Sequence, residues 1–548
     1  MKKIVFTVYL IFFVLILFAQ NSNPLRFEIP VRNGTDPINY ISAGEQGICI
    51  FYPTINDAGK DSVSWSFLMT DNNLKEKWRK LVPMHEDVTF LKGIARNNAV
   101  YLLFHDTKRN KNGNIFVYLV IPQLQLITEQ RSSIPDKAEV VDFEMLDENA
   151  LVGYNSKKGQ PGLSGFSLVS GEQRNFDITA EKDALLLDIS LDTLQKKVFA
   201  TYKVQSSSSK NHLFVNSYSI YGVLEQTFDF TDQQERRNIN SAQYIPLGKN
   251  KGIVTGTYGY YTSSRRNYNY YDNFYNYYYN SYSSYYNRQQ DYNANDDNTP
   301  VSDGYFAASL TNNIANGIKY YSFSDFSHAF KYMTDVSAIR AKMRVEKKKN
   351  DKPDETKPIE ADEKDKSLNL KIVAHEADLQ NGQIIMASEA YTPEFHTVTR
   401  MSYDFYGRAY PMSYQVFDGF RYSNAFIAAF DSTGNMSWNN GMEMRDIITK
   451  YLNKKLNFLY DSDEIVLYYN ANNKVAFKTI KGSTVIENTT YTPISPKMGT
   501  DQPLEEYLGT IEHWYGDYFI ATGYQTVKNN YLENNRRNVF YLNKLAFK

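Results

Sequence analysis

One phrase recurs along this chain, as WSFLMTDNNLKEKW (Trp65–Trp78), FSLVSGEQRNF (Phe166–Phe176), FAASLTNNIANGIKYY (Phe306–Tyr321) and FIAAFDSTGNMSWN (Phe426–Asn439). Each copy reads as an apolar strand, a turn rich in Asn, Asp, Ser or Gly, and a second strand. A strand–turn–strand unit that returns every 40–55 residues, roughly, is typical of a β-propeller. The sequence therefore predicts an all-β fold.

Reading outward from this phrase gives eight units, each with four strands lettered A to D from the centre outward. The B and C strands are the clearest, as in Ala99–His105 and Asn114–Ile121 of the second unit. Leu25–Val31 reads as a strand before the first unit, and the last unit lacks a clear D strand. We therefore expect eight four-stranded blades, with the ring closed by the N-terminal strand. Seven blades are the alternative if one unit is misread.

The N-terminus has the pattern of a secretory signal. Lys2 and Lys3 precede an apolar run over Ile4–Phe18, and Ala19 is a plausible last residue before cleavage. The prediction is a signal peptide over residues 1–19 and one propeller domain over residues 20–548. A retained anchor is the alternative, although a membrane helix needs roughly 18 or more apolar residues. We expect export, without a transmembrane span once the signal is removed.

Three long insertions interrupt the repeat. They are a Tyr-rich loop at 262–303, a charged linker at 344–366 whose composition predicts disorder, and an aromatic hairpin at 392–423. The first and third join a B strand to a C strand, and the second joins a D strand to the next A strand. Because B–C and D–A connections of a propeller emerge on one face, we expect all three insertions to lie together on that face. Insertions gathered on one face often mark the binding face.

Two of these insertions supply candidate binding residues. Tyrosine offers a rigid ring with a polar tip, and aromatic rings beside arginines are typical of interface anchors. The alternatives are a low-complexity loop without a specific ligand and rings that pack on a neighbouring blade. The candidates are Tyr268, Tyr270, Tyr271, Tyr275, Tyr277, Tyr278 and Tyr279 in the loop, and Tyr403, Phe405, Tyr406, Arg408, Tyr410, Phe420, Arg421 and Tyr422 in the hairpin.

Acidic and imidazole side chains on the A strands suggest a second kind of site. A strands line the central channel of a propeller, and converging carboxylates and imidazoles can perform acid–base chemistry. The more ordinary interpretation is that such groups are simply solvated. The channel candidates are Asp142, Asp188, His375, Glu376, Glu512 and His513.

Other classes of function lack support in the sequence. A net charge of -1 provides no basic field for nucleic acid. The 7 His are scattered without HxH or HExxH spacing, so we predict no metal and no cofactor. The single cysteine, Cys49, lies in an apolar strand, which predicts a buried thiol and no internal disulfide.

The stretch AFDSTGNMSW (Ala429–Trp438) resembles the tryptophan-docking repeat of quinoprotein-like propellers, with one residue fewer between Asp431 and Thr433. FSLVSGEQRNF is a weaker echo that lacks the Trp. This resemblance implies a fold and not a bound quinone. The stretches EAYTPEF, DFYGR and VFDGFRYSNA are similar to uncharacterised exported propeller proteins of the Bacteroides–Flavobacterium group. That similarity implies export to the periplasm or the outer surface of a Gram-negative bacterium, and no known activity.

Taken together, these patterns favour an exported, non-enzymatic binding or scaffold propeller that presents a Tyr/Arg-rich face to a protein or glycan partner. The sequence makes no prediction of oligomeric state. One alternative is a glycan-active hydrolase or lyase that uses the channel carboxylates. A third class, an outer-membrane β-barrel, requires strands that alternate apolar and polar residues. Continuous apolar runs such as IFVYLVI (Ile115–Ile121) argue against it.

Overall fold

The structure is a computed structural model of the 548-residue chain. It describes residues 25–32, 38–59, 62–106, 113–157, 160–178, 184–205, 211–230, 237–260, 300–331, 342–343, 347, 367–403, 405–450, 452–532 and 535–546. The predicted signal peptide and nearly all of the charged linker lie outside these residues, as do the loop candidates Tyr268, Tyr270, Tyr271, Tyr275, Tyr277, Tyr278 and Tyr279.

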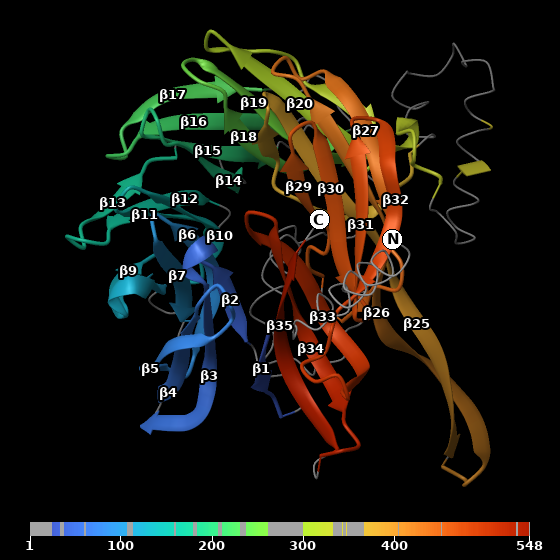
Figure 1. Cartoon of the computed structure of the whole chain (residues 1–548). Helices are drawn as coiled ribbons and strands as arrows, with labels where there is room; N and C mark the ends of the chain where they lie inside the picture. Colours follow the sequence, from blue (N-terminus) through green and yellow to red (C-terminus); the bar gives the residue numbers. More distant parts are fainter. Residues whose placement is uncertain are drawn as a thin grey trace, which may run out of the picture.

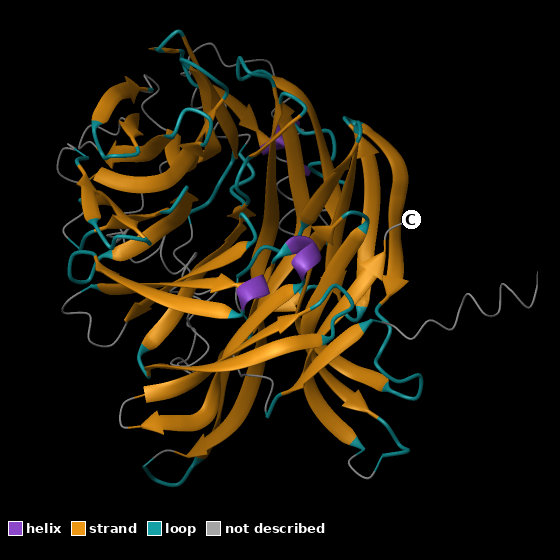
Figure 2. Cartoon of the chain, turned by 60° about the vertical axis from the view of Figure 1, so that its left-hand side comes forward, coloured by secondary structure: helices purple, strands orange, loops and turns teal. Residues whose placement is uncertain are grey.

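Within the described residues the strands form eight antiparallel sheets that follow one another as the blades of a ring (Figure 1, Figure 2). Strand order within each sheet follows chain order, except that the first strand joins the last sheet. The predicted all-β propeller with eight blades is therefore confirmed.

The strands have the following bounds. Blade one comprises β2 (Asn39–Ser42), β3 (Ile48–Gly59), β4 (Ser62–Thr70) and β5 (Glu76–His85), and blade two comprises β6 (Val88–Arg96), β7 (Ala99–Asp106), β8 (Asn114–Ile121) and β9 (Leu126–Ser133). Blade three comprises β10 (Glu139–Leu146), β11 (Asn149–Asn155), β12 (Pro161–Ser167) and β13 (Gln173–Phe176), and blade four comprises β14 (Ala184–Asp192), β15 (Lys197–Gln205), β16 (Asn211–Ser219) and β17 (Leu224–Asp229). Blade five comprises β18 (Arg237–Pro246), β19 (Lys251–Tyr260), β20 (Gly304–Thr311), β21 (Ile314–Ala315) and β22 (Lys319–Ser322). Blade six comprises β23 (Lys371–Ala374), β24 (Asp378–Gln380), β25 (Gln383–Tyr403), β26 (Ala409–Phe430), β27 (Met436–Glu443) and β28 (Ile448–Thr449). Blade seven comprises β29 (Asn457–Asp461), β30 (Glu464–Ala471), β31 (Lys474–Lys481) and β32 (Thr484–Pro493), and blade eight comprises β33 (Gln502–Tyr515), β34 (Tyr518–Lys528), β35 (Arg536–Ala546) and β1 (Arg26–Pro30). Short 3-10 turns occur at η1 (Gly44–Gln46), η2 (Pro122–Leu124) and η4 (Phe323–Asp325).

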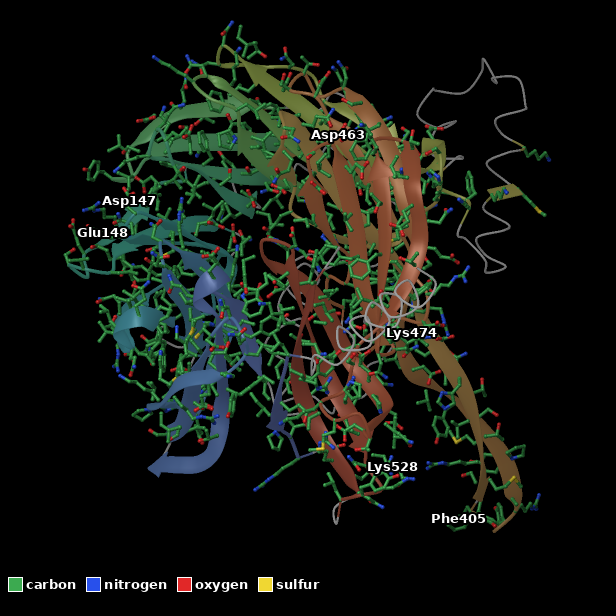
Figure 3. The ribbon with its side chains drawn as sticks, in the orientation of Figure 1. Asp147, Glu148, Phe405, Asp463, Lys474 and Lys528 are labelled. Carbon is green, nitrogen blue, oxygen red and sulfur yellow. The ribbon has the colours of Figure 1, made fainter. Side chains whose placement is uncertain are left out.

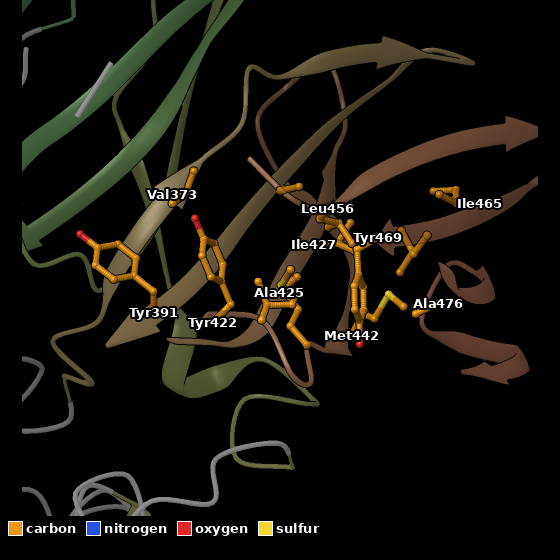
Figure 4. Packing of buried hydrophobic residues seen from close by; sticks show 14 of the residues in the cluster. Val373, Tyr391, Tyr422, Ala425, Ile427, Met442, Leu456, Ile465, Tyr469 and Ala476 are labelled. Carbon is orange, nitrogen blue, oxygen red and sulfur yellow. The ribbon is translucent and has the colours of Figure 1, made fainter. Parts of the chain in front are cut away.

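Each blade packs on the next through its own buried apolar cluster. The eight clusters of the described residues fall between consecutive blades, and one of them unites blade eight with blade one. Figure 4 shows the cluster between blades six and seven, where Ile427 faces Tyr469. Cys49 is buried between blades one and two, and burial raises the pKa of its thiol to about 12. None of the helices among the described residues is long and apolar enough to cross a membrane.

The insertions attach where the sequence places them in the repeat. The Tyr-rich loop follows β19 and precedes β20, and the hairpin consists of the outer parts of the paired strands β25 and β26 in blade six. Ser302, at the end of the loop, pairs with Leu370, which follows the charged linker. Asp303 is buried and accepts a hydrogen bond from the Asn369 amide at 2.9 Å. The C-terminal ends of these two insertions therefore lie side by side, and Ser302 and Asp303 belong to the folded ring.

Ring closure depends on β1, which pairs antiparallel with β35 from Arg26–Asn543 to Pro30–Val539. The predicted closing strand is confirmed. The Arg26 guanidinium is buried, donates to Asn543 at 3.0 Å and to Gln525 at 2.6 Å, and pairs with Glu28 at 2.8 Å. It also lies 4.4 Å from the ring centroid of Tyr541. These contacts join the first residues of the folded chain to its last two strands.

We expect Arg26→Ala to lower the free energy of unfolding by about 3 kcal/mol, because Glu28 would then lose its nearest buried counter-charge. Arg79→Ala is the matched control: Arg79 pairs with Glu76 at 2.7 Å on the surface, and its loss should cost less than about 1 kcal/mol. Urea unfolding followed by tryptophan fluorescence measures both changes. Equal effects of the two substitutions would contradict the assigned role of the closing strand.

Candidate functional site in the central channel

A β-bulge recurs at one position in the innermost strands of four consecutive blades. Pairing with the second strand of the blade is interrupted in the middle of β6, β10, β14 and β18. Bulges re-aim side chains and are common next to active sites. The residues at which pairing resumes are Lys92, Asp142, Asp188 and Ser241, all of them polar and all lining a channel cavity.

Two cavities lie along the channel in the described part of the chain. The larger has a volume of about 610 Å³ and is lined by the inner strands or adjoining connections of blades one, two, three, six, seven and eight. The smaller, about 40 Å³, is lined by blades four, five and six. Glu376 lines both cavities. The channel is therefore walled by every blade.

The structure places all six predicted channel residues on these walls. Those lining the larger cavity are Asp142, Glu376, Glu512 and His513, and those lining the smaller are Asp188, His375 and Glu376. Binding or catalysis by these groups stays a prediction, because their position on the wall does not identify a reaction.

An ion-pair network occupies one side of the channel. The Lys92 ammonium lies 2.6 Å from Asp142 and 3.3 Å from Glu144. Burial lowers the pKa of Lys92, but the carboxylates of Asp142, Glu376 and Glu144 outweigh this and raise the pKa well above its usual value. Lys92 therefore stays charged and neutralises part of a carboxylate-rich wall.

The carboxyl groups of the network hold protons unequally. Burial, reinforced by Asp142, raises the pKa of Glu144 to about 7 despite Lys92, and burial together with Asp142 and Glu376 raises the pKa of Asp188. By contrast, Lys454 and Lys92 lower the pKa of Glu376 to about 2. The Glu376 side chain is 59% exposed and lies 3.5 Å from Lys454, so channel water screens that pair.

Glu512 differs from the other channel acids because burial alone raises its pKa, to about 7. Its Oε1 atom is buried and has no hydrogen-bond partner in the described residues. The neighbouring His513 donates from Nε2 to the Gly516 carbonyl at 2.7 Å. Glu512 and the ionised Glu376 line the same cavity, and two carboxyl groups with such different pKa values are the arrangement from which acid–base pairs are built.

His375 has a structural partner. Its Nε2 lies 2.6 Å from Oε1 of Glu389, a buried carboxylate that also accepts from the amides of Lys455 and Leu456. Among the residues that the sequence reasoning missed are Lys92, Lys454 and Glu389. For Lys92 a signal existed: it is a polar residue in the middle of an apolar inner strand, at the position of Asp142 and Asp188.

The hairpin candidates divide into two groups. The outer part of the hairpin, Phe395–Phe417, is here named the aromatic arm, and it projects away from the ring (Figure 1, Figure 3). Tyr403, Phe405, Tyr406, Arg408 and Tyr410 lie exposed on it, with Phe405 98% exposed at the tip. Arg408 lies over the ring of Tyr406, at 5.6 Å from its centroid.

The other three candidates lie at the base of the arm, and two of them require correction. Phe420 and Tyr422 are 1% and 2% exposed and belong to the cluster between blades six and seven. Tyr422 donates to the Asn453 carbonyl at 2.6 Å. They are core residues because β26 has already entered the blade there, while Arg421 between them points outward to Glu394 at 2.7 Å.

No group of three or more His, Cys, Asp or Glu side chains within the described residues is arranged to hold a metal ion. No protein-family model matches the chain, and no curated protein sequence matches it.

Comparison with solved structures finds propeller-type proteins over most of the chain. The crystal structure of polysaccharide lyase Uly1 aligns with 96% of this chain and 100% of its own, at 9% identity and a TM-score of 0.36. An ulvan lyase of family PL25, bound to -[GlcA(1-4)Rha3S]-, aligns with 79% of this chain and 88% of its own, at 10% identity and a TM-score of 0.37. The β-propeller domain of the Trilobed protease from Pyrococcus furiosus aligns with 83% of this chain and 95% of its own, at 6% identity and a TM-score of 0.33. Similarities this low carry no inference about activity.

The raised pKa of Glu512 predicts a pH-dependent stability difference. With a pKa of about 7 in the folded protein against an ordinary 4.5, the folded protein holds a proton that the unfolded chain releases, so stability falls as pH rises through this window. Glu512→Gln removes that loss. Relative to the wild type, the variant should gain on the order of 2 kcal/mol between about pH 5 and about pH 8.

Urea unfolding of both proteins across this pH range measures the difference. Glu505→Gln, an exposed position on the same strand, is the control and should follow the wild-type pH profile. A Glu512→Gln profile parallel to the wild type would show that this carboxyl is not held protonated.

Proposed function

We propose that the protein is an exported, non-enzymatic binding propeller that captures a protein or glycan partner with the aromatic arm. The observation that carries the proposal is the concentration of exposed large apolar side chains on this one ribbon: Met401, Tyr403, Phe405, Tyr406, Tyr410, Met412 and Tyr414. Soluble proteins rarely leave such a concentration uncovered without an interaction to cover it. The apolar N-terminal segment and the resemblance to exported propellers support the export component of the proposal.

The arm exposes apolar side chains on both of its faces. Ser402 pairs with Tyr410 and Arg400 with Met412, so Tyr410 and Met412 share one face, whereas Tyr403, which pairs with Ala409, lies on the other. Packing against the ring therefore does not explain the apolar side chains on either face. A two-stranded ribbon is marginally stable by itself, so the arm depends on its continuation into blade six.

The chemistry of the arm favours a protein over a glycan. Met401, Met412 and Phe405 provide apolar surface without a hydrogen-bonding group, whereas sugar hydroxyls require polar partners. Tyr, Met and Arg are the residue types enriched at protein interfaces. Arg400 lies over Tyr414 at 5.6 Å from the ring centroid, which holds a cation beside the aromatic surface.

A second candidate function, a glycan-active hydrolase or lyase, has its own supporting observation. Glu512 and Glu376 line the same cavity, and their pKa values move in opposite directions, to about 7 and about 2. Such a divergence is the usual mark of an acid paired with a base. In this function Glu512 would donate a proton and Glu376 would accept one.

Site-specific photocrosslinking tests the binding proposal. A benzophenone amino acid at position 405, introduced into the full-length protein in the cells that make it, should yield a defined protein adduct. The same label at Leu194, which is 95% exposed on the turn between β14 and β15, is the control and should not. Replacing Tyr403 and Tyr410 with Ser should reduce the amount of adduct by at least tenfold. Aromatic side chains that a partner buries as interface anchors each contribute about 2 kcal/mol or more to the free energy of binding.

The Ser variant should unfold within about 0.5 kcal/mol of the wild type per substitution, since the replaced side chains are exposed. Equal crosslinking from positions 405 and 194 would contradict the proposal. A blank result at 405 together with strong binding on a glycan array would assign the arm to a glycan instead.

A polysaccharide screen separates the two functions. The binding proposal expects neither new reducing ends, the product of a hydrolase, nor the ultraviolet absorbance of an unsaturated uronate, the product of a lyase. Turnover that falls at least 100-fold in Glu512→Gln and Glu376→Gln, and persists in the Ser variant of the arm, would establish the second candidate and reject the first.

A further inference from the structure

Two carboxylate oxygens in the channel lack a partner. Oε1 of Glu512 and Oδ2 of Asp188 are buried, and neither has a hydrogen bond in the described part of the chain. A buried polar atom without a partner is costly, and native proteins retain one where function or a bound group requires it. Glu512 lines the larger cavity and Asp188 the smaller.

Carboxyl groups also outnumber ammonium groups around the channel. Five carboxyl groups occupy its inner strands and connections, namely Asp142, Glu144, Asp188, Glu376 and Glu512. Two ammonium groups accompany them, and both already have carboxylate partners: Lys92 with Asp142 and Glu144, and Lys454 with Glu376. The channel therefore has acceptor capacity that the chain itself does not use.

The larger cavity combines this acceptor capacity with apolar walls. Ile41, Leu91, Val141 and Leu452 line it together with neutral polar residues such as Asn453. Its volume of about 610 Å³ is that of a small-molecule site. An ammonium group has three donors and no acceptor, so it fits where carboxylate oxygens await donors. The cavity thus suits a small molecule with a cationic head and an aliphatic or ring-shaped body.

We propose that the larger channel cavity binds a primary organic ammonium ion, with Glu512 as the principal acceptor and the apolar wall around Leu91 and Val141 against the rest of the ligand. This site is separate from the aromatic arm and requires no turnover, so it goes beyond both candidate functions. The shared chemistry is the ammonium group, which a polyamine, an amino sugar or a lysine side chain could each supply.

The site should depend on pH through Glu512. The titratable groups that line the same cavity are Tyr40 from β2, Lys92 from β6, Asp142 from β10, Glu376, Lys454 and His513. Tyr468 from β30 also interacts electrostatically with Glu512. Burial raises the pKa of Glu512 to about 7, so below this value the ligand must displace a proton before it pairs with the carboxylate. Binding should therefore weaken as pH falls below about 7, and it should release protons in that range.

Isothermal titration calorimetry on the full chain, after removal of any signal segment, tests the proposal with three probes: spermidine, glucosamine and Nα-acetyl-lysine amide. The expected result is saturable one-to-one binding of at least one probe, and the probe that binds identifies the source of the ammonium group. Glucose and 1,4-butanediol, which lack the ammonium, should not bind. Repeating the titration at pH 6 in buffers of different ionisation heat should reveal proton release.

Glu512→Gln should weaken the bound probe at least tenfold. Glu148→Gln, which removes an exposed carboxylate on the outside of the ring, should leave the affinity unchanged (Figure 3). The Ser variant of the arm should also bind normally, which separates this site from the proposed function. A cooperative melting transition for Glu512→Gln verifies that the variant is folded.

Three outcomes would overturn the proposal. They are the absence of binding by all three probes at millimolar concentration, equal affinities for Glu512→Gln and Glu148→Gln, and binding of glucose as tight as that of glucosamine. Magnesium ions are a further control: displacement of the probe by equimolar Mg²⁺ would assign the carboxylates to a metal instead of an ammonium.

Discussion

The structure depends on face-to-face packing of each blade against two neighbours. A single four-stranded sheet cannot bury both of its faces, and here every cluster of the apolar core lies between two blades. Blades one and eight pack on each other through one such cluster, to which Ile29 of β1 contributes, and β1 pairs with β35 at the end of the folded chain. Closure thus adds the fourth strand to blade eight and covers the edge that β35 would otherwise expose.

Closure also explains how the channel can hold so many charges. The inner strands converge on the axis, and the bulges turn Lys92, Asp142 and Asp188 away from the apolar interfaces and toward the axis. The raised pKa values of Glu144 and Asp188 show that the surroundings disfavour the ionised forms of these acids. The apolar packing of the ring offsets that cost, so the channel is a place where polar groups are kept for reasons other than stability.

The repeated phrase predicted the eight blades because strand alternation and turn chemistry are local. In blades one and six the same local chemistry forms the same turn, in which Asp71 and Asp431 each accept two backbone amides. The pairing of Lys92 with Asp142 could not be predicted from the sequence, since it depends on bulges in two separate blades. The burial of Phe420 was missed because alternation does not show where a ribbon enters its blade. That point is set by Gly419, whose φ of 145° lies in a region that favours glycine, and where a Cβ would meet Ile448 and Thr449 at 2.8 Å.

The two faces of the aromatic arm would constrain the geometry of the proposed partner. A flat surface laid on the ribbon would cover Tyr410 and Met412 and leave Tyr403 in water, or the reverse, because the pairing register places them on opposite sides. A partner that buries the whole apolar surface must therefore enclose the ribbon, or two partners must meet across it. Phe405, which is 98% exposed, lies at the tip of the arm and would enter such an enclosure first (Figure 3). In the proposed function the ring would be the base that presents the arm, and the channel would remain free for the proposed ammonium ligand.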